Sequence, residues 1–455
     1  MRLRTHTSTR SESHALVGLV AVSALVLAVL VLILALGDQR RLDVTLASPA
    51  ERDSVPSTVS EIAISFNREP NHGAVEAAFS LVPQAEGTLR WRGRTLLFVP
   101  GRALDTGPYV VRITAGTLGR ADEPMEDDFE LHFTVREPGV AAIVSDGAVE
   151  RLVELRSDGR QRDLASAPRI SSFAVAPGGA EVAVVSSDKE GWGTLSLVDL
   201  ATGNSAPVVQ SAQISIGGVA WSPDGGTLVV IRRDKLPSGI EGTPRAWLLR
   251  RNGEFVAPID PDGNPSLYPS WSPDGQQLGY VSPSDAKMVV RNLTTEETHV
   301  VGQPRGGAMS WSPDSTMVAF EAVPETSAVS SSQPQPVRVV SLDGTYDRSF
   351  GTTEDVRLAP KFWDKTTIVS LKRGIGSQGG GTELVFESLT DASVLRSIHL
   401  TGGADLILDW DLDRSRRTLL YAVLTAGHVS TFELDLESGS RTKLPIDGNS
   451  PRWIP

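Results

Sequence analysis

The stretch Ala220-Trp221-Ser222-Pro223-Asp224-Gly225 decides the fold, because the chain repeats it as Ser270-Trp271-Ser272-Pro273-Asp274-Gly275 and Ser310-Trp311-Ser312-Pro313-Asp314-Ser315. Each copy is followed by a short run rich in β-branched and aromatic residues, which is typical of a strand. The copies recur at intervals of roughly 40 to 50 residues, and strand-rich repeats of that length are typical of β-propeller blades. The repeat therefore predicts an all-β propeller.

The residue types of the phrase indicate a turn between two strands. The tryptophan supplies a large apolar side chain to bury between neighbouring blades. Proline fixes φ, the aspartate side chain accepts hydrogen bonds from backbone N–H groups, and glycine adopts a positive φ without strain. The phrase thus specifies a scaffold, and a scaffold does not identify its ligand.

Weaker copies of the phrase extend the repeat in both directions. They lie at residues 173–179, 360–365, 409–413 and 451–455. The last copy has no strands after it, whereas predicted strands at 141–144, 150–155 and 160–164 have no copy before them. Joining these segments closes the ring and leaves no unpaired sheet edge. We therefore predict a seven-bladed propeller over residues 140–455. A six-bladed ring is the alternative, if the weak copy near Trp363 belongs to a neighbouring blade.

The Trp-Ser-Pro-Asp-Gly phrase resembles the WD-like repeats of TolB-type bacterial propellers over residues 141–455. The resemblance implies the propeller fold and is specific for this phrase alone. TolB-type proteins carry a different, α/β N-terminal domain and are soluble in the periplasm. For that reason the resemblance does not carry a partner over to this chain.

Residues 42–136 consist of short alternating segments with almost no helical periodicity. The candidate strands are 62–66, 88–91, 95–98, 109–113 and 129–133. A segment of this size and pattern suits an immunoglobulin-like β-sandwich. The phrases Ile64-Ser65-Phe66-Asn67 and Phe79-Ser80-Leu81-Val82-Pro83 also resemble bacterial SbsA-type Ig-like domains. That resemblance implies a spacer or adhesion-type module without chemistry of its own.

Residues 15–37 carry no charged side chain. At ~1.5 Å per residue, a helix over this stretch spans a ~30 Å hydrocarbon core. The tail before it, residues 1–14, carries Arg2, Arg4 and Arg10, which favours a cytoplasmic N-terminus. We expect a transmembrane helix that anchors the chain in the cell membrane, with the later domains extracytoplasmic. A cleaved secretory signal or a buried core helix is the alternative, although a signal has an apolar region of only ~7–15 residues.

The composition excludes several classes of function. The formal net charge is −12, which argues against a nucleic-acid-binding surface. The chain has no cysteine, so disulfides, thiol catalysis and cysteine-ligated zinc are absent. None of the 7 histidines stands in a zinc-binding motif. We predict no catalytic residue, cofactor or metal, and the composition says nothing about the oligomeric state.

Two acidic segments are candidate sites. Asp409, Asp411 and Asp413 alternate, so a regular strand would place them on one face, where they could hold a cation or transfer protons. The simpler interpretation places Asp413 at the turn aspartate of the repeat, matching Asp224. The segment 260–264 resembles a calcium loop but lacks its glycine and bidentate glutamate, so we predict a plain turn.

The longest loops carry the predicted binding surface. Segments 187–193, 232–245, 322–336 and 372–381 each follow the second predicted strand of a blade, so all four lie on one face of the ring. Loops on one end of a rigid scaffold are where binding residues concentrate. The candidate partner-binding residues are Trp192, Arg232, Arg233, Lys235, Lys372 and Arg373.

Together these patterns predict a membrane-anchored binding or scaffold protein. Its partner would be a protein or a cell-envelope polymer held by the loop face between the second (B) and third (C) strands of the blades. The alternative is an enzyme with a carbohydrate-active or hydrolytic site in the propeller channel. Two carboxyl groups of raised pKa at the channel mouth would favour the enzyme.

Overall fold

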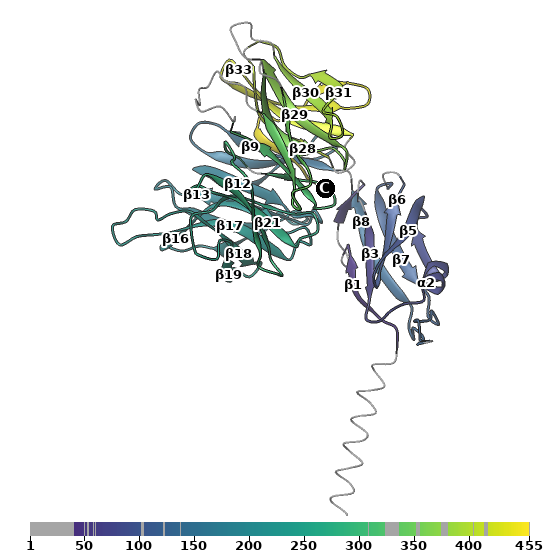
Figure 1. The fold of residues 1–455 in the computed structure, drawn as a ribbon. Coiled ribbons are helices and arrows are strands. Elements are labelled where there is room, and N and C mark those ends of the chain that lie inside the picture. The colour runs from purple at the N-terminus through teal and green to yellow at the C-terminus, as the bar shows by residue number, and fades with distance from the viewer. Residues whose placement is uncertain are drawn as a thin grey trace, which may run out of the picture. The chain divides into compact units, whose positions relative to one another are not determined.

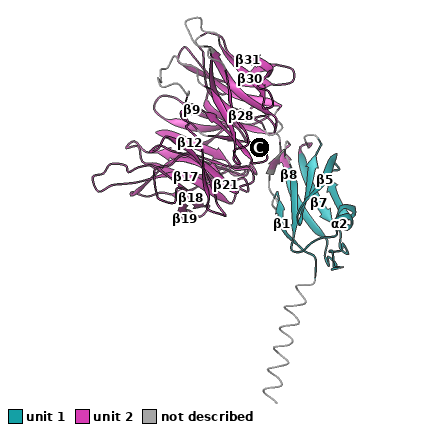
Figure 2. Cartoon of the chain, viewed as in Figure 1, with its two compact units in different colours: residues 1–52, 61–102, 107–134 teal, residues 53–60, 103–106, 135–455 magenta. Residues whose placement is uncertain are grey.

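The computed structural model describes residues 41–454, apart from 50, 52–53, 58, 60, 102–103, 122, 137, 308, 324–335, 352–354, 375–380, 404 and 414–416. The predicted tail 1–14 and transmembrane helix 15–37 lie outside the described residues. Among the described residues, no helix is long and apolar enough to cross a membrane. The chain divides into two compact units, residues 1–52, 61–102 and 107–134, and residues 53–60, 103–106 and 135–455 (Figure 2).

The first eight strands form two four-stranded sheets, with orders β1-β3-β6-β5 and β2-β8-β7-β4. All five segments predicted as strands here are strands, although the structure extends several of them. One helix was missed: α2, which begins after Asn71, whose side chain accepts a hydrogen bond from the backbone N–H of Ala74. The elements are β1 (Val44–Ser48), β2 (Ser54–Pro56), β3 (Ile62–Phe66), α2 (His72–Ala78), β4 (Phe79–Val82), β5 (Gly87–Arg92), β6 (Thr95–Pro100), β7 (Gly107–Ile113) and β8 (Phe129–Arg136).

The second unit has the all-β architecture of a propeller, and its described residues contain seven four-stranded antiparallel sheets (Figure 1). Six sheets each use four consecutive strands, and we call the earliest of the four the first strand. The first three of these sheets comprise β12 (Arg169–Val175), β13 (Glu181–Ser187), β14 (Gly193–Asp199), β15 (Ser205–Val209), β16 (Ile214–Trp221), β17 (Thr227–Asp234), β18 (Arg245–Arg250), β19 (Phe255–Pro258), β20 (Leu267–Trp271), β21 (Gln277–Ser282), β22 (Lys287–Asn292) and β23 (Thr298–Gly302).

The next three sheets follow the same order. They comprise β24 (Ser310–Trp311), β25 (Met317–Glu321), β26 (Val337–Ser341), β27 (Asp347–Phe350), β28 (Asp355–Phe362), β29 (Thr367–Gly374), β30 (Thr382–Ser388), β31 (Val394–His399), β32 (Leu406–Leu412), β33 (Thr418–Thr425), β34 (His428–Asp435) and β35 (Arg441–Lys443). The four long loops predicted from the sequence all join the second and third strands of their sheets.

The remaining sheet joins distant parts of the chain, as expected for a closed ring. Its first strand is β36 (Asn449–Ile454), followed by β9 (Gly139–Ser145), β10 (Glu150–Leu155) and β11 (Gln161–Ala167). Buried clusters join consecutive sheets. One of them packs Val153 and Leu155 of β10 against Leu420 of β33, and another packs Ile454 of β36 with Ile170 of β12. The sheet made by β36 and β9–β11 therefore packs on both its neighbours.

The repeated phrase performs the role predicted for it. The Ser222 hydroxyl donates to Asp224 and accepts from the backbone N–H of Thr227, and Asp224 also accepts from the backbone N–H of Gly226. The pairs Ser272–Asp274 and Ser312–Asp314 repeat this turn. The Ser–x–Asp element therefore closes the hairpin between the first and second strands.

The weak copy around Trp410 is shifted by two residues from the predicted alignment. The backbone N–H of Asp413 donates to Thr418, and the Asp413 carboxylate accepts from the backbone N–H of Thr418. Ser222 makes the corresponding two bonds with Thr227. Asp413 therefore takes the place of Ser222, not of Asp224 as predicted. The sequence pattern does not reveal this shift, because a shift of two residues keeps the same side chains on each face of a strand.

The copy near Trp363 is shifted by one residue. Phe362 pairs with Ile368 as Trp221 pairs with Leu228, so Phe362 holds the position of the repeated tryptophan. Trp363 instead packs edge-on against Phe386, with ring centroids 5.2 Å apart.

Candidate functional site

The predicted loop face brings two of its candidate residues into contact. Trp192 ends the loop between β13 and β14, and Lys235 begins the loop between β17 and β18 of the next sheet. The Lys235 Nζ atom lies 4.4 Å from the centroid of the Trp192 ring. This cation–π contact joins loops of two neighbouring sheets.

Arg232 and Arg233 are at the end of β17, where both already have acidic partners. The Arg232 guanidinium contacts Asp234 at 2.7 Å and lies over the rings of Trp247 and Phe255 at 4.8 and 4.6 Å. Arg233 pairs with Glu241 at 3.5 Å across the base of the loop. The positive charge of these two arginines is therefore largely balanced by Asp234 and Glu241.

Lys372 and Arg373 belong to another sheet and do not join this group. Both are strand residues of β29, where Lys372 lies opposite Arg357 and Glu383, and its Nζ atom is 3.7 Å from the Glu383 carboxylate. The structure thus brings Trp192 and Lys235 into contact, pairs Arg232 and Arg233 with acidic residues instead, and places Lys372 and Arg373 in another sheet.

Two exposed apolar residues of the β17–β18 loop were not predicted from the sequence. Leu236 and Ile240 have 47% and 67% of their surface exposed. Backbone hydrogen bonds from Leu236 to Ile240 (2.9 Å), from Gly239 to Leu236 (2.8 Å) and from Gly242 to Asp234 (2.8 Å) hold the loop as a tight hairpin. We call Trp192, Lys235, Leu236 and Ile240 the hairpin surface. Apolar residues flanking Pro237-Ser238-Gly239 were the available signal, since turn tips are exposed.

A second candidate is a cavity of about 520 Å³ among the first strands. It is lined by residues 172–175 of β12, 219–220 of β16, 411–412 of β32 and 452–453 of β36, together with Pro138 and with Asp413, which follows β32. Polar and apolar atoms contribute about equally to its wall, and its charged groups are Asp411, Asp413 and Arg452.

Ion pairs between first strands surround this cavity. The Asp411 carboxylate contacts the Lys361 Nζ atom of β28 at 3.2 Å and accepts a 3.2 Å hydrogen bond from the backbone N–H of Trp453 in β36. Arg452 contacts Asp409 at 2.8 Å. Asp411 and Asp413 therefore line the cavity, whereas Asp409 holds Arg452 from outside the lining. Among the described residues no cluster of three acidic, histidine or cysteine side chains suits a metal ion.

One carboxyl group near the cavity has a perturbed pKa. Burial raises the pKa of Glu433, and the nearby charges of Asp413 and Asp435 raise it further. Glu433 is not among the cavity-lining residues, whereas Asp413 is. An enzyme would be favoured by two carboxyl groups of raised pKa that both open to the cavity. Glu433 does not line the cavity, so Glu433 and Asp413 do not form such a pair.

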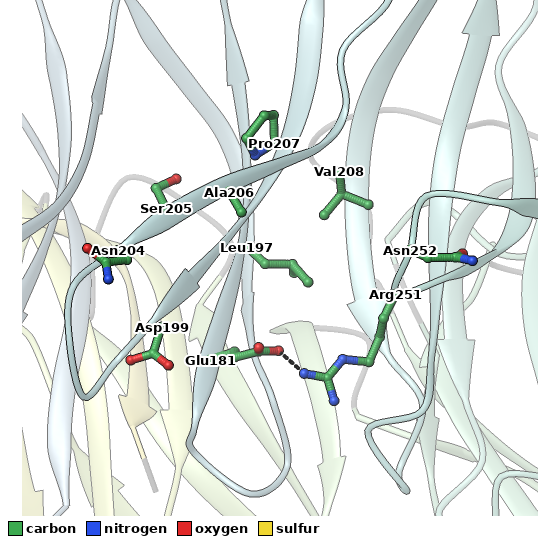
Figure 3. Close-up of a pocket in the computed structure, with 10 residues that line it drawn as sticks. All are labelled: Glu181, Leu197, Asp199, Asn204, Ser205, Ala206, Pro207, Val208, Arg251 and Asn252. Atoms are coloured by element: carbon green, nitrogen blue, oxygen red, sulfur yellow. Dashed lines mark hydrogen bonds and ion pairs between the residues drawn. The ribbon is translucent and has the colours of Figure 1, made fainter.

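A shallower pocket of about 370 Å³ lies between the β12–β15 and β16–β19 sheets (Figure 3). Glu181 and Arg251 close one side with an ion pair of 2.6 Å. Hydrogen bonds from the backbone and side chain of Thr202 lower the pKa of Asp199 despite some burial; the backbone bond contributes most. Glu181 is thus paired with Arg251, and Asp199 with Thr202. These pairings suit a packing contact between two sheets.

The segment 260–264 is the plain turn that the sequence predicts. Asp260 accepts hydrogen bonds from the backbone N–H groups of Asp262 and Asn264 and from the Tyr280 hydroxyl at 3.1 Å. Burial, followed by the Asp260 charge, raises the pKa of Tyr280. The carboxylate therefore serves the turn and its tyrosine.

Comparisons with known proteins find resemblance in structure alone. No family model matches the sequence. No curated protein matches it either. Among solved structures, TolB from Acinetobacter baumannii has 11% identity and a TM-score of 0.44, covering 91% of this chain and 99% of its own. The periplasmic gluconolactonase PpgL of Pseudomonas aeruginosa has 16% identity and a TM-score of 0.47, covering 70% and 99%. An oligogalacturonate lyase in complex with manganese has 14% identity and a TM-score of 0.44, covering 55% and 72%. At this level of similarity no activity or partner is transferred to this chain.

Proposed function

We propose that this chain is a membrane-anchored, extracytoplasmic binding protein that engages a partner protein through the hairpin surface. In this proposal residues 15–37 form the anchor with the N-terminus in the cytoplasm, and residues 42–136 form an Ig-like stalk. The seven sheets of the second unit are seven blades of one propeller, which serves as a rigid support for its loops.

The observation that carries the proposal is the exposure of Leu236 and Ile240 on a hydrogen-bonded hairpin. A preformed loop loses little conformational entropy on binding, and its apolar tip gains free energy when a partner covers it. Arg232 and Arg233 are paired with Asp234 and Glu241, so Lys235 is the one cation that the hairpin surface presents. We therefore expect the partner protein to have an apolar recess that receives Leu236 and Ile240. Its surface does not have to be acidic.

Site-specific photo-crosslinking tests the binding surface. A benzoylphenylalanine is placed at position 240 of the full chain in its native cells, and a control chain carries it at Val394, which is 56% exposed on β31. We expect a light-dependent protein adduct from position 240 alone. Leu236→Ser with Trp192→Ala is expected to reduce that adduct about tenfold, as a loss of about 1.4 kcal/mol of binding free energy would. Leu395→Ser, on β31, is the matched exposed control. Equal adducts from both positions, or no loss in the double variant, would refute the proposed surface.

The anchor is tested separately, using the absence of cysteine from the chain. His6→Cys and Val300→Cys are labelled in intact spheroplasts with a maleimide that does not cross membranes. We expect labelling at position 300 and none at position 6. Labelling at both positions, or release of the chain from washed membranes, contradicts the anchored topology.

A further inference from the structure

The second unit contains a cluster of arginines that shares no residue with the hairpin surface or with the cavity among the first strands. Glu154, near the end of β10, is 3% exposed and lies opposite Arg162 in the β10–β11 pair. The Nε and Nη2 atoms of Arg162 contact one oxygen of this carboxylate, Oε2, at 2.9 and 2.7 Å. The Nε atom of Arg156, which follows β10, contacts the same oxygen at 3.3 Å. One buried carboxylate therefore holds two guanidinium groups.

A third guanidinium group, that of Arg136, has no carboxylate of its own. Arg136 is the last residue of β8 and belongs to the second unit, and its Nη2 atom donates a 2.8 Å hydrogen bond to the backbone carbonyl of Gly179. No ion pair joins it to a carboxylate of the described residues, and the negative charge that acts on it most is that of Glu154. Burial lowers the pKa of Arg136, and the Glu154 charge opposes this only in part. The charges of Arg156 and Arg162 lower that pKa further.

The other acidic residues near the cluster are engaged elsewhere. Asp158 is held by Arg160 at 2.7 Å. Asp199 accepts hydrogen bonds from the backbone N–H and the hydroxyl of Thr202 at 2.7 and 2.9 Å. Three guanidinium groups around the single carboxylate of Glu154 leave two positive charges in excess, on a chain whose formal net charge is −12. A dianion would neutralise this excess.

The cluster also has N–H groups to spare. Arg156 bonds Glu154 through Nε alone, and Arg136 bonds Gly179 through Nη2 alone. The other nitrogens of these two guanidinium groups have no partner among the described residues, and none of them is a buried atom. The Arg156 side chain is 41% exposed, so an ion in solution can reach the cluster. Guanidinium groups donate pairs of hydrogen bonds to phosphate oxygens.

We propose that Arg136, Arg156 and Arg162 bind a phosphate dianion, either free phosphate or the terminal phosphate of a larger molecule. The phosphate oxygens accept hydrogen bonds from the free N–H groups of the arginines. Glu154 remains bonded to Arg156 and Arg162 and orients them. The two negative charges of the phosphate match the excess of the cluster, whereas a monoanion leaves one positive charge unbalanced.

Calorimetric titration of the full chain with three probes tests the charge and the source of the ligand. At pH 8 inorganic phosphate and glycerol 3-phosphate are mainly dianions, because the second phosphate pKa is near 6 to 7, whereas dimethyl phosphate is a monoanion. Salt at 0.15 M reduces the Debye length to about 8 Å and so screens long-range attraction. We expect saturable binding of a dianion and at least tenfold weaker binding of dimethyl phosphate.

The two dianions distinguish the sources. Tighter binding of glycerol 3-phosphate would assign the site to the phosphate of a larger molecule, and tighter binding of inorganic phosphate would assign it to the free ion. Dimethyl phosphate binding as tightly as the dianions, or no saturation with either dianion, would overturn the proposal.

Two variants with the same change of charge locate the site. Arg136→Gln removes the guanidinium group that has no ion pair, and Arg250→Gln removes one that is paired with Glu254 at 2.6 Å in another sheet. We expect Arg136→Gln to weaken binding of the tighter dianion at least tenfold and Arg250→Gln to leave it unchanged. Equal effects would show attraction to the overall charge only and would refute the site.

A measurement on the unmodified chain covers the case in which Arg136→Gln does not fold. Phenylglyoxal modifies accessible arginine side chains, and mass spectrometry of the peptides locates the adducts. The tighter dianion at saturation is expected to slow the modification of Arg156 at least fivefold, relative to chloride of equal ionic strength, and to leave Arg250 unaffected. An Arg156 that is modified equally fast in both salts would overturn the proposal.

Discussion

The indole Nε1 of Trp221 donates a 3.0 Å hydrogen bond to the backbone carbonyl of Ala174, on the first strand of the preceding sheet. Trp311 makes the same bond to Ser270 at 3.3 Å. The repeated tryptophan thus joins adjacent sheets by a directed bond as well as by apolar burial. In Trp271 the buried indole N–H has no partner among the described residues.

Replacement of these tryptophans by phenylalanine separates the bond from the burial. Trp221→Phe and Trp311→Phe leave a backbone carbonyl without its donor, whereas Trp271→Phe removes a donor that bonds nothing. We expect the first two to lower the free energy of unfolding by about 1 kcal/mol more than Trp271→Phe does. Urea denaturation followed by circular dichroism measures this difference. Equal losses in all three variants would show that the bond contributes nothing.

The buried pair Arg357–Glu387 is expected to be costly to break. Arg357 and Glu387 are 2% and 3% exposed and are joined by two hydrogen bonds of 3.1 and 3.2 Å. Glu387→Ala leaves a buried guanidinium with less compensation, and we expect a loss of about 3–5 kcal/mol in the free energy of unfolding. Arg357 also contacts the buried carboxylate of Asp355 at 3.3 Å, so all three charges have to be removed together. The triple variant Asp355→Asn, Arg357→Met and Glu387→Leu is expected to be more stable than Glu387→Ala alone. A triple variant less stable than Glu387→Ala would contradict this account.

The turn at Asp343 makes stability depend on acid pH. Hydrogen bonds from the Ser341 hydroxyl, and then from the backbone N–H and hydroxyl of Thr345, lower the pKa of Asp343 to about 2. Because the folded state holds the ionised form, this contribution is present above the ordinary pKa near 4 and is lost as the pH falls from about 4 to 2. Asp343→Asn is expected to flatten the fall of the urea midpoint over that interval. Asp285→Asn, at an exposed carboxylate paired with Lys287, is the control and should leave the slope unchanged.

Ring closure is expected to depend on Ile454. This side chain is fully buried in the cluster that includes Ile170 and Leu152. Ile454→Ala should lower the free energy of unfolding by about 2–5 kcal/mol, because it leaves a cavity between two sheets. Leu395→Ala, at a residue 58% exposed on β31, should cost less than about 0.5 kcal/mol. Similar losses in both variants would mean that β36 is not an integral part of its sheet.

The repeat phrase allowed the strands and the pairing of distant segments to be predicted because its turn chemistry is local. Ser222 and Asp224 lie within one hairpin, so sequence alone identifies that turn. The alignment at Trp410 was wrong by two residues. Every second residue of a strand faces the same side of the sheet, so a shift of two leaves the pattern of buried and exposed side chains unchanged. Trp363 was misassigned because Phe362 is also aromatic and adjoins it.

The candidate site was harder to predict than the fold. Arg232 and Arg233 were predicted as partner-binding residues, but each already pairs with a carboxylate of the same hairpin, Asp234 or Glu241. The cavity is lined by residues of β12, β16, β32 and β36, which are far apart in the sequence, so no local pattern predicts it. Leu236 and Ile240 lie beside the predicted Lys235, and the turn sequence between them was the signal for their exposure.

The pairing of β9 with β36 has a consequence for the order in which the protein acquires its structure. Ile143 and Asn449 are partners in this sheet, although about 300 residues separate them, a very long loop to close. While the chain is being synthesised, the sheets between them can form from neighbouring segments, but β9 keeps an open edge. Completion of that sheet is therefore expected to be the slow, late step, and the waiting edge of β9 is where a chaperone would protect the nascent protein from aggregation.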